Sequence, residues 1–360
     1  MLDRFRRALC FWLSVFELLA GWRGWWGLSW LGRAFPRWLL WPMSLAVLPA
    51  AQDGWGRLAV SLVLTAPPAL LLQIAASSLR GRALNPLLRL RPACYADRTI
   101  TRLDIPMRPG HLPALHVVPH PGATAAVCVL HGSGCDKTAY VWRLVDALVG
   151  RGMAVLLIDL DGHGENPRPQ SFPAILEDVA VAVAWLRARY QRVGVLGISL
   201  GGCIAARASA DGVAVDALAV LEAPPTLHYT QADVRREALA LARLVLLDTF
   251  SDCTVYHLVR AWDFAPIRAA ISTWDLITAL DLPGSLPKIA APLLLVYGAR
   301  DAIVKPAQAE QVRRAMPHGA QFQIVPGASH LTLILTPAAL SLIGSWFAEV
   351  LEANKQSFGD

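Results

Sequence analysis

The chain has 360 residues, of which 55% are hydrophobic and only 17% are charged, and its six cysteines are dispersed. This length fits one large domain with an appendage or two modest domains, and a charged fraction well below the roughly 25% of an ordinary soluble domain indicates contact with lipid. The cysteines form no CxxC pair and no zinc spacing with histidine, which argues against a zinc site and favours free thiols in a reducing compartment.

The net charge of +6 is concentrated in one part of the chain. Residues 1–100 contain twelve arginines and four acidic residues, a net charge of +8, so residues 101–360 carry −2. The arginines alternate with apolar runs and tryptophans, and eight of the thirteen tryptophans fall within the first 55 residues. This pattern is typical of a membrane flank with an interfacial aromatic belt and not of a phosphate-binding surface, so no nucleic-acid partner is expected.

Residues 1–91 are predicted to form a membrane-anchor region. Residues 58–79 contain no charge over 22 positions, which is long enough for a helix to cross about 30 Å of hydrocarbon. A shorter apolar run over residues 38–51 precedes them across a Gln-Asp-Gly turn, so residues 38–79 are expected to form a helical hairpin. Arginines flank both ends of the hairpin, and the positive-inside rule therefore places both flanks in the cytoplasm.

Two other interpretations of this region stay open. Arg4, Arg6 and Arg7, followed by an apolar stretch, also fit a cleaved signal peptide, although Glu17 lies within that stretch and a longer apolar run follows. A hydrophobic helical subdomain that never enters a membrane is the second alternative.

From about residue 92 onward, short β-branched runs alternate with helical stretches. This alternation predicts an α/β fold for residues 92–360, with a mainly parallel central sheet and crossover helices. A helix is expected within residues 171–190, where Ile175, Val179, Val183 and Leu186 recur at near-helical spacing. The expected strands are 125–130, 154–159, 192–198, 217–222, 293–297 and 321–325, preceded by an antiparallel hairpin within residues 99–118.

Residues 224–288 interrupt this alternation with largely helical sequence, including residues 232–248. An insertion at this place is expected to form a helical cap over the edge of the sheet.

The sequence RVGVLGISLGG at residues 192–202 contains a GxSxG pattern between an apolar strand and a helix of small residues. The sharp turn requires the flanking glycines and lifts the Ser199 hydroxyl above the sheet edge, where the N-terminus of the following helix favours an anion. Ser199 is therefore the predicted nucleophile, and the backbone amide of Leu200 is the predicted first donor to an oxyanion.

The HGSG sequence at residues 131–134 directly follows the first predicted parallel strand. A loop at this place supplies the second oxyanion donor, and we assign that role to the backbone amide of Ser133. His131, which begins the loop, is expected to pack and to hold the loop by hydrogen bonds rather than to act as a base.

Two further motifs complete a catalytic constellation. Asp301, in YGARDAIV, follows one predicted strand, and His330, in VPGASHLTL, follows the next. His330 is the predicted base that accepts the Ser199 proton, and Asp301 is the predicted acid that orients its imidazole. Glu222, at the end of a preceding strand, is the rival for the acid role because an acid there can also reach the histidine.

With the chain order Ser, Asp, His, residues 99–352 resemble the α/β-hydrolase superfamily. The sequence LIDLDGHGENP at residues 157–167 is similar to the DxxGHGxS loop of that superfamily, with Glu165 and Asn166 in place of small residues. The resemblance implies a serine hydrolase that needs no cofactor. Asp159, Asp161 and His163 in this loop are expected to stabilise a turn, and no metal site is expected because no second ligand cluster lies at metal spacing.

We therefore expect an enzyme that cleaves a carboxylic ester or thioester through an acyl-enzyme intermediate, anchored to a membrane with its catalytic domain in the cytoplasm. The apolar residues of the predicted cap exceed what one buried helix face requires, which indicates an apolar or lipid-like acyl substrate. Acyl transfer and peptidase chemistry on the same triad are alternatives, because one fold hosts many activities. A non-catalytic membrane scaffold is the alternative from a different class.

Overall fold

The computed structural model describes residue 90 and residues 92–139, 141–247 and 267–353. The hairpin predicted for residues 38–79 lies outside these residues, as does the segment 248–266 of the predicted cap. In the part of the chain that is described, no helix has an apolar stretch of the length that spans a bilayer.

The chain divides into two compact units. The smaller unit consists of Met1–Arg89 and Val234–Pro266, and the larger one of Leu90–Asp233 and Ile267–Asp360. Within the smaller unit, the structure describes most of helix α9 (Gln231–Leu247), in agreement with the helix expected over residues 232–248. The larger unit contains the sheet and all the predicted site residues.

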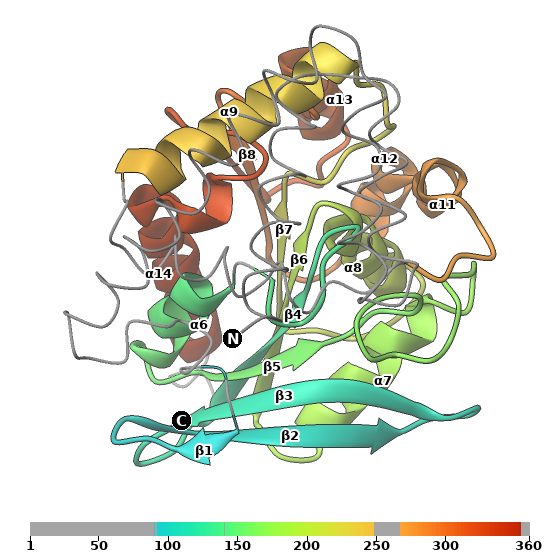
Figure 1. Ribbon diagram of the computed structural model, residues 1–360. Helices are drawn as coiled ribbons and strands as arrows, with labels where there is room; N and C mark the ends of the chain where they lie inside the picture. The colour runs from blue at the N-terminus through green and yellow to red at the C-terminus, as the bar shows by residue number, and fades with distance from the viewer. Residues whose placement is uncertain (1–89, 91, 140, 248–266, 354–360) are drawn as a thin grey trace, which may run out of the picture. The chain divides into compact units, whose positions relative to one another are not determined.

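Nine strands of the larger unit form one sheet in the order β1-β2-β3-β5-β4-β6-β7-β8-β9, which twists through the centre of the unit (Figure 1). Strands β1, β2, β3 and β5 pair antiparallel in that order, and all pairs from β5 to β9 are parallel. The strands are β1 (Ala93–Cys94), β2 (Arg98–Pro106), β3 (His111–Pro119), β4 (Ala125–Leu130), β5 (Ala154–Ile158), β6 (Arg192–Ile198), β7 (Ala217–Leu221), β8 (Leu293–Gly298) and β9 (Gln321–Val325).

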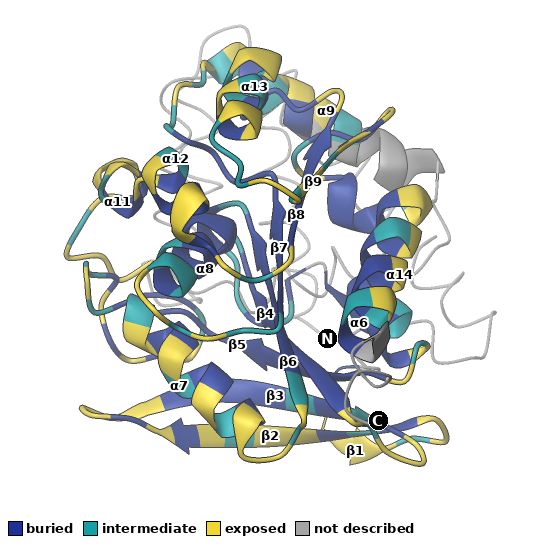
Figure 2. Ribbon diagram, turned by 180° about the vertical axis from the view of Figure 1, so that it is seen from behind, coloured by how far each residue is buried: buried dark blue, intermediate teal, exposed yellow. Residues whose placement is uncertain are grey.

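The parallel strands β4, β5, β6, β7 and β8 are apolar because helices cover both faces of the sheet, whereas the edge strand β9 is mostly exposed. Every residue of β4, β5, β7 and β8 is buried, and Figure 2 shows these strands as the buried centre of the unit. The predicted strands are confirmed, with three ends shifted by one residue: β8 continues to Gly298, whereas β5 and β7 stop before Asp159 and Glu222. Both acidic residues therefore begin the loops that leave the carboxyl edge of the sheet.

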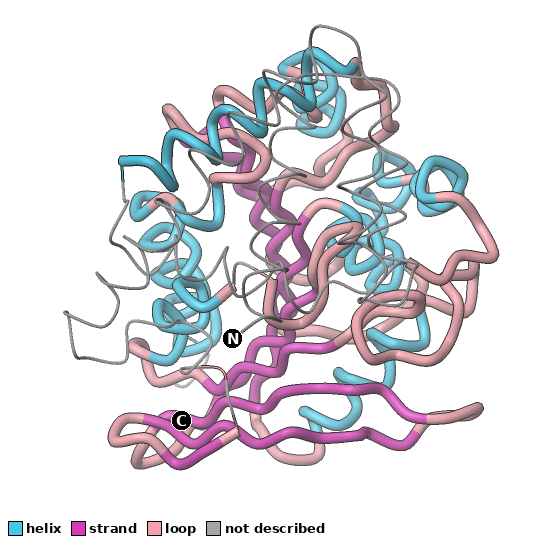
Figure 3. Tube along the Cα trace, viewed as in Figure 1, coloured by secondary structure: helices cyan, strands magenta, loops and turns pink. Residues whose placement is uncertain are grey.

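Helices α6 and α14 lie on one face of the sheet, and α7, α8, α11 and α12 lie on the other (Figures 1 and 3). Helix α7 begins and ends within the stretch 171–190 in which it was expected. The four residues at near-helical spacing are all buried. The helices are α6 (Trp142–Val149), α7 (Leu176–Arg187), α8 (Leu200–Ala210), α11 (Thr273–Leu280), α12 (Leu282–Ser285), α13 (Pro306–Arg314) and α14 (Pro337–Ala353), with short 3₁₀ turns at Leu286–Lys288 and Leu333–Leu335.

Candidate functional site

Ser199 lies at a sharp turn between β6 and α8. Its backbone φ of 52° lies in the left-handed region, which residues other than glycine rarely adopt. Such backbone strain is typical of functional positions. The turn is held in place because the Ser199 amide donates to the Leu221 carbonyl at 2.8 Å, while the Ser199 carbonyl accepts from the amides of Gly202 at 2.9 Å and Cys203 at 3.2 Å. The hydroxyl-bearing residue is thus fixed at the carboxyl edge of the sheet.

Close backbone contacts explain the glycines around Ser199. A Cβ on Gly197 would overlap the backbone of Gly201. A Cβ on Gly201 would lie 2.6 Å from the carbonyl oxygens of both Leu130 and His131. Only glycine fits at either position, and the turn therefore lies directly against the loop that follows β4.

The structure brings Ser199, His330 and Asp301 together from three different loops. His330 Nε2 lies 3.1 Å from Ser199 Oγ, and His330 Nδ1 lies 2.8 Å from Asp301 Oδ2. The other carboxylate oxygen of Asp301 accepts the amides of Ile303 at 2.8 Å and Val304 at 2.7 Å. Asp301 is buried. The backbone amides orient one oxygen of its carboxylate, and the other oxygen orients the imidazole of His330.

Glu222 also lies near this histidine. It is fully buried directly after β7, with a φ of 51°. One of its carboxylate oxygens lies within 4.8 Å of a carboxylate oxygen of Asp301 and of a ring nitrogen of His330. Three such residues can in general hold a metal ion. The ring nitrogens of His330 instead face Asp301 and Ser199, an arrangement suited to proton transfer rather than to ligation.

The two amides predicted to bind an oxyanion flank Ser199. Leu200 is the first residue of α8, where amides have no acceptor within the helix. A Cβ on Gly132 would lie 3.5 Å from the Ser199 Cβ, so the loop carrying Ser133 passes close to Ser199. Ser133 is exposed, and its hydroxyl lies 3.3 Å from the Thr273 hydroxyl at the start of α11.

His131 holds the beginning of this loop. Its Nε2 accepts the amide of Leu160 at 3.2 Å, so its Nδ1, 2.8 Å from the Gly132 carbonyl oxygen, carries the proton. His131 is therefore neutral and is oriented as the sequence predicts, toward the backbone rather than toward Ser199. Burial lowers the pKa of His163, whose ring centroid lies 5.1 Å from that of His131, to about 4, so His163 is uncharged at neutral pH.

The second half of the loop after β5 is tied by its own side chains. Asn166 donates its amide group to Asp161 Oδ1 at 3.1 Å and to the Asp159 carbonyl at 3.0 Å. Arg168 lies 3.2 Å from the Asp161 carboxylate, and the Asp161 amide donates to Asp178 Oδ2 at 2.7 Å. Burial raises the pKa of Asp178 well above its usual value. The turn-stabilising role predicted for Asp161 agrees with these contacts.

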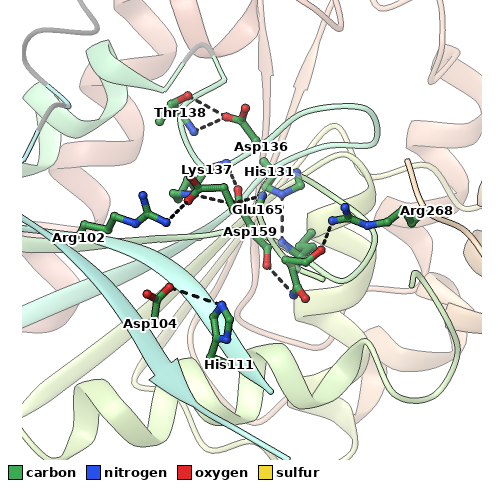
Figure 4. A network of polar contacts seen from close by, with 12 residues as sticks. Arg102, Asp104, His111, His131, Asp136, Lys137, Thr138, Asp159, Glu165 and Arg268 are labelled. Atoms are coloured by element: carbon green, nitrogen blue, oxygen red, sulfur yellow. Dashed lines mark hydrogen bonds and ion pairs between the residues drawn. The ribbon is translucent and has the colours of Figure 1, made fainter. Parts of the chain in front are cut away.

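Lys137 is the polar residue near the site that sequence reasoning missed. Its ammonium is buried between Asp159 at 2.5 Å and Glu165 at 2.8 Å (Figure 4). Burial alone would favour the neutral amine, but the two carboxylates outweigh it and raise the pKa of Lys137 above its ordinary value. The available signal was composition, because the chain has only four lysines and this one follows the HGSG motif.

Comparison with known proteins places this chain in a family. The model of the alpha/beta hydrolase family matches residues 126–341. An uncharacterized protein of Mycobacterium tuberculosis is 28% identical over 216 residues, which cover 58% of this chain and 64% of the relative, less than two thirds of its length.

Other proteins that this chain resembles include two esterases. A pimeloyl-[acyl-carrier protein] methyl ester esterase of Neisseria meningitidis is 25% identical over 258 residues, covering 64% of this chain and 95% of the relative. Among solved structures, a thermophilic esterase from Thermogutta terrifontis superposes with a TM-score of 0.53 and 22% identity, covering 71% of this chain and all of that one. On the match of its central 216 residues and its sheet order, the chain belongs to the alpha/beta hydrolase family.

Proposed function

We propose that this protein is a serine hydrolase that cleaves a carboxylic ester or thioester, with Ser199 as nucleophile, His330 as base and Asp301 as the orienting acid. The proposal rests on two hydrogen-bond distances that link these three side chains. Ser199 Oγ lies 3.1 Å from His330 Nε2, and His330 Nδ1 lies 2.8 Å from Asp301 Oδ2. Family membership supports a hydrolase-type activity.

The mechanism follows from the orientation of these groups. A serine hydroxyl is a weak nucleophile, so His330 Nε2 takes its proton as Ser199 Oγ attacks the carbonyl carbon. The resulting oxyanion accepts hydrogen bonds from the amides of Leu200 and Ser133, and His330 then returns the proton to the leaving group. A water molecule, activated by the same histidine, releases the acid from the acyl-enzyme.

Exposed apolar side chains beside the site favour an apolar acyl substrate. Leu331 directly follows His330 and is 40% exposed. Trp274 directly follows Thr273, whose hydroxyl contacts Ser133, and is 52% exposed. Large apolar side chains in this position gain free energy by contact with an acyl chain, and the esterase name of the Neisseria relative supports an acyl ester as the substrate class.

We further propose that residues 1–91 anchor the protein to a membrane, with the catalytic domain facing the cytoplasm. The basis is the uncharged run of 22 residues and the arginines on both sides of the predicted hairpin. An apolar anchor is not held by charge, so the protein is expected to stay in the membrane fraction through a high-salt wash and to need detergent. Release by salt alone would contradict this anchor.

Labelling with a fluorophosphonate tests the catalytic proposal, because this reagent phosphonylates activated serines. Wild-type protein is expected to be labelled, and Ser199→Ala is expected to lose the label. Ser341→Ala is the matched control, because Ser341 is an exposed serine of α14 with no role in the proposed site, and it should be labelled like wild type. Labelling that persists in Ser199→Ala, or folded wild-type protein that takes up no label, would contradict the assignment of Ser199.

A further inference from the structure

The loop of residues 131–137, which carries the proposed donor Ser133, is held at both ends by the neighbouring loop. Strands β4 and β5 are parallel neighbours with Leu130 opposite Ile158, so the loops that follow them leave the sheet side by side. At the near end of the loop, the amide of Leu160 donates to His131. At the far end, Asp159 binds Lys137.

The contact between Lys137 and Asp159 at the far end of the loop is a buried ion pair with several hydrogen bonds. Asp159 Oδ1 accepts the Lys137 backbone amide at 2.7 Å, and Oδ2 accepts the Lys137 ammonium at 2.5 Å and the Glu165 amide at 2.9 Å. The side chains of Lys137 and Asp159 are 8% and 0% exposed. Three contacts from N–H donors to two oxygens are the pattern that an ionised carboxylate accepts.

The surroundings pack closely against this ion pair. Gly164 has a φ of 52°, and a Cβ on it would overlap the Asp159 carboxylate. On the other side, Glu165 Oε2 contacts the Lys137 ammonium at 2.8 Å and Arg102 at 3.4 Å (Figure 4). Asp159 therefore binds the backbone and the side chain of Lys137 at once, which fixes the end of the loop in both position and direction.

We propose that Lys137 and Asp159 are positioning residues for the oxyanion donor, and this inference rests on the proposed hydrolase function. Neither residue needs to touch the substrate. Their ion pair holds residues 131–137 at a fixed distance from Ser199, so that the Ser133 amide meets the oxyanion when it forms. A displacement of about 1 Å at a catalytic group costs on the order of 100-fold in rate, so this anchor acts on the transition state more than on substrate binding.

Replacement of Lys137 by methionine removes the charge and keeps the length of the side chain. For a p-nitrophenyl ester, Lys137→Met is expected to lower kcat by about 10- to 100-fold and to change KM by less than about threefold. Affinity for a trifluoromethyl ketone should fall in the same proportion as kcat/KM, because its hemiketal with Ser199 places an oxygen anion at the same donors. Lys137→Arg keeps the charge and should recover part of the loss.

The matched control is Arg98→Met, which removes another buried cation. Arg98 is paired with Asp97 and with Asp146 on α6, both at 2.6 Å, and it has no role in the proposed site. Both methionine variants are expected to melt at lower temperature, whereas only Lys137→Met should lose turnover and inhibitor affinity. Equal losses of turnover in the two variants would reduce Lys137 to a structural role and overturn the proposal.

Two results keep this inference separate from the proposed function. Wild-type protein that hydrolyses no ester and takes up no fluorophosphonate would refute the hydrolase function. Active wild type, with full kcat in folded Lys137→Met, would refute only the positioning role of Lys137 and Asp159. If Lys137→Met does not fold, Glu165→Gln removes the partly exposed partner of the ammonium and is expected to lower kcat by about twofold to fivefold. An unchanged kcat in that variant would also overturn the positioning role of Lys137 and Asp159.

Discussion

Replacement of Gly201 by alanine is expected to disturb the site without touching any of its side chains. The added Cβ would lie 2.6 Å from the carbonyl oxygens of both Leu130 and His131, where an ordinary contact begins at 3.4 Å. The Leu130 oxygen lies at the end of β4, which pairs with strands on both sides. Relief of about 0.8 Å of overlap must therefore come from a shift of the Ser199 turn that carries Gly201, together with His131 and the loop beyond it.

This movement is expected to cost both stability and rate. Overpacking of this kind destabilises by about 1–3 kcal/mol, which lowers the melting temperature by several degrees, and displacement of the Ser133 amide should lower kcat by about 10- to 100-fold. Thermal unfolding and ester turnover of the purified variant measure the two effects. Gly344→Ala is the control, because its nearest neighbour is the movable end of the Arg151 side chain at 2.7 Å. Unchanged turnover in Gly201→Ala would refute this reasoning.

Three further predictions concern the acid, the response to pH and the substrate. Asp301→Asn should lower kcat by up to about 10⁴-fold through loss of the correct imidazole tautomer, measured by ester turnover, whereas Glu222→Gln should cost far less; a more damaging Glu222→Gln would reassign the acid. Burial lowers the pKa of His163 and of His116 to about 4, so the unfolded chain binds more protons between about pH 6.5 and 4. The free energy of unfolding, from urea titrations, should therefore fall as the pH falls through this window, and His116→Gln should reduce that slope; an identical slope would contradict it. Turnover of p-nitrophenyl esters in detergent should rise severalfold per added pair of acyl carbons until the apolar side chains beside the site are covered, and a strict preference for acetate would refute an apolar acyl substrate.

The central sheet could be predicted from the sequence because parallel strands buried on both faces are continuous apolar runs. Strands β4, β6 and β9 have the predicted ends, and the strand-turn-helix around Ser199 follows from its glycines and the small residues after them. Asp301 and His330 could be predicted because each follows an apolar strand in the chain order of the family. The local sequence carries all of this information.

The contacts between loops could not be predicted in the same way. Lys137 and Asp159 are 22 residues apart, and they meet only because β4 and β5 are neighbours in a sheet whose order departs from chain order. The proximity of Glu222 to Asp301 and His330 likewise depends on how β7 and β8 pair. Such pairs depend on long-range topology and leave no periodicity in the sequence.

The central claim is that the reaction passes through an ester on Ser199. Intact-protein and peptide mass spectrometry after rapid acid quench of the purified protein with a p-nitrophenyl ester tests it most directly. We expect the mass of one acyl group on the peptide that contains Ser199, more of it in wild type than in His330→Ala, and none in Ser199→Ala. Full turnover without an acyl group on Ser199, or with the acyl group on another residue, would contradict the account.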